Sequence, residues 1–171
     1  MKWLLLITFV ATVNGQDLGA AIAAAPPETW VGYEVPMQSG RGTICSNWNG
    51  NNSSIHTYQS KLMLDGPRTM KILFNGSKML LASEDCVIDT GSQKLIMLPN
   101  ISPAASIHYL AKREDDSGIH AISLHKDPLA VPTLIAMIRD SKNAKRQKKA
   151  MFWLARSTDP KAEEFILSVL R

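Results

Sequence analysis

Histidines, cysteines and clustered carboxylates are the side chains of this sequence that could perform chemistry. Of the four histidines, His120 and His125 are the closest pair, at five residues apart. Two metal ligands on one face of a helix are typically four residues apart, so we interpret both as surface or helix-end residues. The sequence contains no G-x-S-x-G, H-E-x-x-H, P-loop or G-x-G-x-x-G motif. We therefore predict no catalytic residue, no metal ligand and no cofactor.

Two clusters of carboxylates are candidates for general acid–base catalysis. Glu84 and Asp85 flank an expected strand, and residues 114–116 lie between two expected helices. The first cluster is typical of a turn, and the second of the amino terminus of a helix, where acidic residues are favoured. An enzyme or enzyme subunit of unknown reaction remains the alternative. It would require a deep pocket lined by Glu84, Asp85 or His108.

Cys45 and Cys86 are the two cysteines of the chain. An even number of cysteines in an exported protein favours a disulfide, and closing such a long loop stabilises a fold by roughly 3 to 4 kcal/mol. A metal site is the weaker interpretation, because neither cysteine has a second ligand at C-x-x-C spacing. We therefore predict a disulfide bond between these two residues.

The beginning of the sequence has the pattern of a signal peptide. Lys2 precedes an uncharged apolar run, and Val13 and Gly15 are small residues in the positions that precede a cleavage site. The run is shorter than the roughly 20 residues of a membrane-spanning helix. We predict a signal peptide over residues 1–15, a periplasmic or secreted protein, and no stable membrane span after cleavage. Residues 16–29, rich in alanine and proline, are expected to form a linker.

Residues 30–99 contain short apolar runs that alternate with turn residues. The runs are WVGYEVPM, KLMLD, MKILF, KMLLAS, CVIDTG and KLIML. Asp65-Gly66 and Asn75-Gly76, which lie between such runs, are typical of β-hairpins. We expect this β-rich region to form a small antiparallel sheet, in which the disulfide joins an early segment to a late one.

From residue 100 to residue 171 the apolar spacing becomes helical. Ser102 and Pro103 have the types favoured at the start of a helix, and Val131, Leu134 and Ile138 fall on one helical face. Helices are expected within SPAASIHYLAKRE, DSGIHAISLH, DPLAVPTLIAMIRD, NAKRQKKAMFWLARS and DPKAEEFILSVLR. The Asp-Pro pair and the apolar spacing after it occur twice, which is typical of an α-solenoid. The predicted class is α+β, with helical hairpin repeats after the sheet.

The segment KRQKKAMFWLARSTDPKAEEFILSVL resembles the helix-turn-helix unit of bacterial HEAT-repeat proteins. The upstream segments WVGYEVPM, DGPR, SEDCVIDTG and LPNISPAASIHYLAKR resemble the β-rich region found before such repeats in exported bacterial proteins. The resemblance implies a scaffold, and only occasionally, as in phycobilin lyases, part of an enzyme. The chain has two such units where relatives typically continue, so it is short or truncated by comparison.

Two sets of residues are candidates for binding a partner. The first is the apolar stripe of the last expected helix, Phe165, Ile166, Val169 and Leu170. We expect part of this stripe to be open for another repeat, a second copy of the chain or a partner protein. The second is the basic run Lys145, Arg146, Lys148 and Lys149. It is typical of a solvated helix face, and binding of an anion or polymer is the alternative.

Phe152 and Trp153, which follow the basic run, are expected to pack between repeats rather than to interleave with the charges. No specific nucleic-acid partner is therefore predicted. The sequence favours an exported protein-interaction or scaffold module, whose partner is a protein of unknown identity or a second copy of the chain.

Overall fold

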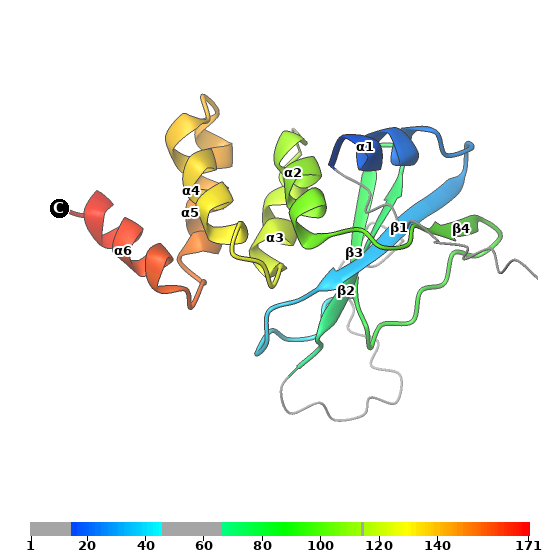
Figure 1. The fold of residues 1–171 in the computed structure, drawn as a ribbon, viewed down its shortest axis with the longest axis horizontal. Coiled ribbons are helices and arrows are strands. Elements are labelled where there is room, and N and C mark those ends of the chain that lie inside the picture. The colour runs from blue at the N-terminus through cyan, green and yellow to red at the C-terminus, as the bar shows by residue number, and fades with distance from the viewer. Residues whose placement is uncertain (1–14, 46–65, 114) are drawn as a thin grey trace, which may run out of the picture.

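The computed structural model describes residues 15–45, 66–113 and 115–171 (Figure 1). In chain order the elements are α1 (Gly15–Ala23), β1 (Thr29–Pro36), β2 (Thr69–Asn75), β3 (Lys78–Ser83), β4 (Lys94–Met97), α2 (Pro103–Lys112), α3 (Ser117–Leu124), α4 (Ala130–Asp140), α5 (Ala144–Leu154) and α6 (Pro160–Val169). The strands form one sheet and most helices follow it, which confirms the predicted α+β class. In the described part of the chain, no helix is long and apolar enough to cross a membrane. The expected strand KLMLD lies outside the described residues.

The sheet has the strand order β3-β2-β1-β4 and is mixed. β1 pairs with β2, and β2 with β3, in antiparallel register, and Gly76 adopts a positive φ of 56° in the turn between β2 and β3. β4 instead runs parallel to β1, with Ile96 opposite Val31. The expectation of a purely antiparallel sheet was therefore wrong for β4. Because β3 and β4 lie at opposite edges, a tight hairpin cannot join them.

Residues 86–91, which we expected to form a strand, are turns and irregular chain in the structure. Local hydrogen bonds replace a strand ladder here. The Asp89 carboxylate accepts from the Gly91 N–H at 2.8 Å, and the Thr90 hydroxyl donates to the Gln93 carbonyl at 2.8 Å. Side chains of this kind compete with regular structure when they bond to nearby backbone groups.

A helix lies where we expected a linker over residues 16–29. The side chain of Leu18 on α1 is completely buried, and Gly19 lies against the ring of Tyr109 on α2. The alanine-rich composition that suggested a linker also favours a helix once an apolar surface is available to cover it. Residues 1–14, nearly all of the predicted signal peptide, lie outside the described residues.

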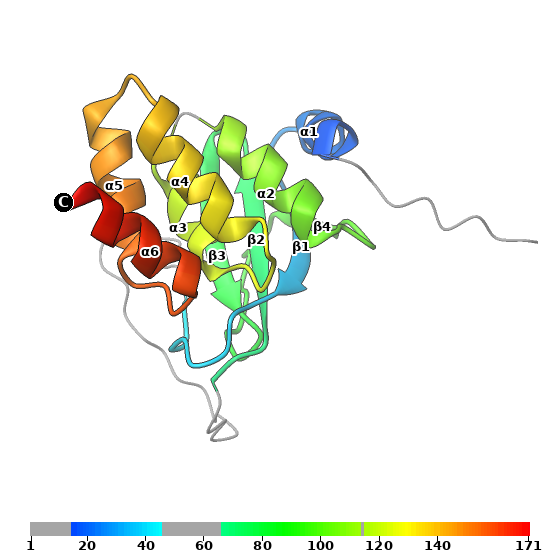
Figure 2. The same cartoon turned by 60° about the vertical axis from the view of Figure 1, so that its left-hand side comes forward.

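The five helices expected after residue 100 are present and are arranged in layers. α2 packs on α3, α4 packs on α5, and α6 packs on α4 at the end far from the sheet (Figures 1 and 2). The backbones of α2 and α3 approach closely at Gly118, where a Cβ atom would lie 2.8 Å from the Leu110 carbonyl oxygen. Glycine is therefore required at this contact.

Three of the five helices after the sheet begin at a capping side chain. Ser102 caps α2, Asn143 caps α5 and Asp159 caps α6, each through a side-chain oxygen that accepts a backbone N–H. α4 is an exception, since it begins at Ala130 rather than directly after Asp127. The Asp127 carboxylate accepts from the Leu129 N–H at 2.8 Å, which forms a turn ahead of the helix.

One continuous core joins the sheet to the helical layers. Tyr33, Ile72 and Leu81 lie side by side across β1, β2 and β3 and are buried. The core continues through the helices in Ile107, Leu110, Ile119, Ile122, Leu134, Leu154, Ala162 and Phe165. The sheet and the helical hairpins therefore share apolar packing, so the helical layers have a fixed position relative to the sheet.

Candidate interaction surfaces

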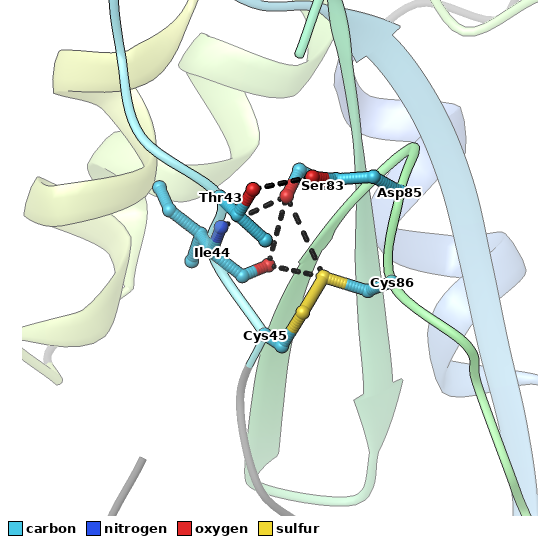
Figure 3. The surroundings of a disulfide bond; sticks show 6 residues. All are labelled: Thr43, Ile44, Cys45, Ser83, Asp85 and Cys86. Carbon is cyan, nitrogen blue, oxygen red and sulfur yellow. Dashed lines mark hydrogen bonds between the residues drawn. A yellow bond between two sulfur atoms is a disulfide. The ribbon is translucent and has the colours of Figure 1, made fainter. Parts of the chain in front are cut away.

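The predicted disulfide is confirmed and ties the segment after β1 to the end of β3 (Figure 3). The Cα atoms of Cys45 and Cys86 are 5.7 Å apart. Beside the bond, the Ser83 hydroxyl accepts from the Ile44 N–H at 2.8 Å and donates to the Ile44 carbonyl at 3.2 Å. The disulfide thus closes a contact that backbone and side-chain hydrogen bonds also hold.

Glu84 and Asp85, the first pair of candidate catalytic acids, form hydrogen bonds next to the disulfide instead. The Asp85 carboxylate accepts from the Thr43 hydroxyl, and the Glu84 carboxylate accepts from the Arg68 N–H at 2.8 Å. Burial alone would raise the pKa of Asp85, but hydrogen bonds from Thr43 and Ser83 outweigh burial and lower it. A carboxylate held in its ionised form by structural hydrogen bonds is a poor general acid.

Within the described part of the chain, a cavity of about 360 Å³ lies between α1 and the turn that joins β2 to β3. Its walls include Ile22, Phe74 and Tyr109, and its one carboxylate comes from Glu28. Glu84, Asp85 and His108, which the enzyme alternative requires in a pocket, do not line it. Within the described ranges, no three His, Cys, Asp or Glu side chains gather as metal ligands.

Most side chains of the predicted basic run have partners. The amines of Lys145 and Lys149 lie 3.2 and 3.6 Å from the carboxylate of Asp116, and the hydrogen bond from Lys145 is the main cause of the lowered pKa of Asp116. Arg146 points to the end of α2, where its two terminal nitrogens donate to the carbonyls of Ala111 and Arg113 at 2.8 and 2.7 Å. The run is therefore largely a link between helical layers, and only Lys148 shows no such partner.

Replacing Arg146 by alanine is expected to lower the free energy of unfolding by about 2 to 3 kcal/mol, because two charge-assisted hydrogen bonds to the end of α2 are lost. Lys148→Ala, which removes an exposed lysine two residues away, should change it by less than about 0.5 kcal/mol. Urea denaturation of both variants measures the difference. Equal effects would contradict a capping role for Arg146.

His125 lies at a helix end, as the C-cap residue of α3, but it is buried rather than at the surface. Its Nε2 and the Tyr33 hydroxyl both contact the Ser106 hydroxyl, at 2.8 and 2.9 Å, and its Nδ1 lies 2.8 Å from the Ala121 carbonyl. Each of these contacts is a hydrogen bond when Nδ1 of His125 donates to the Ala121 carbonyl, the Ser106 hydroxyl donates to Nε2 and the Tyr33 hydroxyl donates to Ser106. The histidine is then neutral, and burial lowers its pKa to about 4. Because Ser106 and His125 are completely enclosed, this serine–histidine contact serves the core.

His120 and the residues after the basic run form a second unpredicted group. The ring of His120 on α3 stacks on Trp153 of α5, with centroids 3.9 Å apart, and Phe152 meets Trp153 edge-on at 5.0 Å. The Arg156 guanidinium lies over the Phe152 ring at 5.6 Å. Phe152 is 54% exposed, so it does not pack between repeats as expected.

Arg41, in the segment that follows β1, interacts through its charge with His120 and Arg156 of this group. Its guanidinium donates to the Gln38 side chain at 3.1 Å, and its backbone carbonyl packs so closely on Gly66 that a Cβ atom there would collide with it. Burial, and then the charge of Arg156, lower the pKa of Arg41. We name this surface the aromatic–arginine cluster: Arg41, His120, Lys149, Phe152, Trp153 and Arg156. Only contacts between distant parts of the chain bring it together, so no sequence motif could have identified it.

No family model, curated protein or solved structure matches this chain. The resemblance to HEAT-repeat proteins thus stays a prediction, and any function must be argued from the surfaces themselves.

The predicted apolar stripe of α6 is divided between two environments. Phe165 is buried, with the Arg139 guanidinium 5.1 Å from its ring centroid, and Ile166 packs against the core. Val169 is 55% exposed and Leu170 is 77% exposed. Leu167, outside the predicted stripe, is also exposed. The inner half of the helix therefore holds α6 on the helical layers, and the outer half presents apolar surface to solvent.

A second exposed apolar segment is strand β4, at the opposite end of the molecule from α6 (Figure 1). Leu95, Ile96 and Met97 are all exposed, although their run of apolar residues is typical of a buried strand. The strand is at the sheet edge and pairs with β1 on one side. Exposed apolar surface in the described residues is thus concentrated at both ends of the fold.

Proposed function

We propose that this chain is an exported protein-interaction module built from HEAT-like helical hairpins, and that it self-associates through the outer face of α6. One observation carries the proposal. α4 packs on α2 and α6 packs on α4, whereas nothing in the described chain covers Leu167, Val169 and Leu170. A repeat unit cannot bury both of its faces alone, so an open face is a place where another helix can pack.

The charges on α6 support a second copy of the chain as the occupant. Residues three, four and seven apart share a helical face, so Glu163 and Glu164 lie on the same side of α6 as Leu167, and Arg171 follows the end of the helix. In an antiparallel pair of α6 helices, the acidic end of one copy meets Arg171 of the other. Such a contact is self-complementary, as a two-fold interface requires.

The expected interface is small, because α6 has ten residues and only part of its surface is open. Interfaces below about 1,200 Å² are typical of weak and transient complexes. Association should therefore depend on concentration, and each apolar contact should contribute measurably. The disulfide supports the exported setting, because such bonds persist in oxidising compartments.

Replacing Leu167 and Leu170 by glutamate is expected to abolish self-association, since the variant places like charges where two apolar faces meet. Sedimentation velocity over a range of concentrations measures the monomer–dimer equilibrium. We expect the wild-type protein to shift towards dimer with concentration and the double variant to stay monomeric. Leu129→Glu is the matched control, because Leu129 is an exposed leucine outside α6.

A wild-type chain that stays monomeric at the highest attainable concentration would contradict the self-association. If that monomer captured another envelope protein, and the Leu167→Glu/Leu170→Glu variant did not, the interaction role would stand with a different partner.

A further inference from the structure

The aromatic–arginine cluster carries more positive charge than Asp116, the carboxylate paired with its Lys149, can balance. Among the described residues, neither Arg41 nor Arg156 forms an ion pair, and Lys149 shares Asp116 with Lys145. Burial first, and then the charges of Lys149 and Arg41, lower the pKa of His120 to about 4, and the charge of Arg156 contributes, after burial, to the lowered pKa of Arg41. Two guanidinium groups whose charges interact, and which have no ion pair within the described chain, are suited to binding a negatively charged group.

The cluster also has unused hydrogen-bond donors. Arg156 contacts the Phe152 ring and Arg41 makes one side-chain hydrogen bond, so most of their N–H groups have no protein acceptor within the described chain. The indole N–H of Trp153 is buried and lacks an acceptor there as well. Unpartnered buried donors are rare in native proteins, because each costs desolvation energy. Donors gathered in this way favour a ligand whose polar atoms are mostly acceptors.

The geometry is extended rather than pocket-like. Phe152 and Arg156 are four residues apart on and just after α5, and Lys148, an exposed lysine, lies four residues before Phe152. At 1.5 Å per residue, Lys148 lies roughly 6 Å from Phe152 along the axis of α5, and Arg156 follows beyond the end of the helix. A single small anion would meet only one of these cations, whereas an anionic polymer would meet several.

We propose that the aromatic–arginine cluster binds an acidic polysaccharide that carries carboxylate groups. Guanidinium groups pair with carboxylates through two parallel hydrogen bonds, which Arg41 and Arg156 can supply to successive sugar units. The C–H face of a sugar ring is apolar and weakly positive, so it suits the negative face of an exposed aromatic ring such as Phe152. This site is separate from the α6 face and does not depend on self-association.

Single-stranded nucleic acid fits the cluster less well. Binding of that kind relies on bases that stack on open aromatic faces. Here His120 already covers one face of Trp153, and Arg156 covers one face of Phe152. The remaining ring surface suits contact with a sugar better than a continuous stack of bases.

The test is titration calorimetry of the full chain, purified from an exporting host, with oligogalacturonate as the probe. We expect binding at about 0.05 M salt that weakens strongly at about 0.5 M, because the contacts are charged and exposed. The Arg41→Gln/Arg156→Gln variant should bind at least about tenfold more weakly. Phe152→Ala should also weaken binding, and this variant should keep its fold because the Phe152 side chain is exposed.

Arg139→Gln is the matched control, because Arg139 also lies over a phenylalanine ring, but between α4 and α6 and outside the aromatic–arginine cluster. It should bind oligogalacturonate as the wild type does. Three results would overturn the proposal: no binding of oligogalacturonate by the wild type at low salt, equal weakening by Arg139→Gln, or tighter binding of an oligothymidine strand than of oligogalacturonate. Circular dichroism of each variant confirms that its fold is retained.

Discussion

Replacing Cys45 and Cys86 together by serine is expected to lower the free energy of unfolding by about 4 kcal/mol. The disulfide closes a loop between residues 41 positions apart, and its loss returns that conformational entropy to the unfolded chain. A domain of this size is typically stable by only about 5 to 15 kcal/mol, so the loss is a large fraction of the total. Urea denaturation followed by circular dichroism gives the midpoint and the slope for both proteins.

The wild-type protein in the presence of a reducing agent is the control for this variant. It should unfold at nearly the same urea concentration as the serine variant, because both lack the bond and keep the Ser83 contacts to Ile44. A serine variant with the wild-type midpoint would show that the bond adds nothing to stability. That result would also remove one support for the exported setting.

The helices were predictable because their signals are local. Ser102 with Pro103, and Asp159 with Pro160, each combine a capping side chain with a residue pre-set for the first helical turn. The apolar spacing that follows then fixes which face of each helix is buried. Neither signal depends on residues elsewhere in the chain, so a single sequence suffices.

The errors in the β region concern contacts between distant residues. The segment KLIM pairs with β1 rather than with β3, because the chain after β3 crosses to the other edge of the sheet. Such a crossing produces no periodic pattern of residue types that a single sequence could reveal. α1 was missed for a related reason. Its burial depends on Leu18 finding an apolar surface next to Tyr109, more than 80 residues later.

The candidate surfaces show the same limit. The basic run was visible as a run of residue types, but the acid that neutralises Lys145 and Lys149 lies on the preceding hairpin. Phe152 looked like core because it is aromatic and precedes Trp153, yet it is the neighbour that faces solvent. Residue types thus identified the segment of interest, and only packing revealed which side chains are available to a ligand.

Lowering the pH from 7 to 4 is expected to lower the free energy of unfolding by about 3 kcal/mol through His125 alone. Burial gives this histidine a pKa of about 4 in the folded protein, against 6.5 in the unfolded chain. Between these values the unfolded chain binds a proton that the folded protein does not. The stabilising contribution is therefore complete above pH 6.5 and is lost as the pH falls towards 4.

His120 acts in the same direction, because its pKa is also lowered to about 4, by burial first and then by the charges of Lys149 and Arg41. Asp85 and Asp116 act in a separate window. Their pKa values are lowered in the fold, so their contributions are lost only below about pH 4, where unfolded carboxylates begin to bind protons. The change between pH 6.5 and 4 therefore reports on the two histidines.

His125→Gln tests this assignment, because glutamine does not titrate. The variant should be less stable than the wild type at pH 7, since the hydrogen bonds to Ser106 and Ala121 are disturbed. Its free energy of unfolding should fall less steeply than that of the wild type between pH 6.5 and 4. The slope of this free energy against pH is the measured quantity. His108→Gln, which changes an exposed histidine, should keep the wild-type slope. If the His125→Gln slope equalled that of the wild type, a buried neutral His125 could not be the origin of the acid sensitivity.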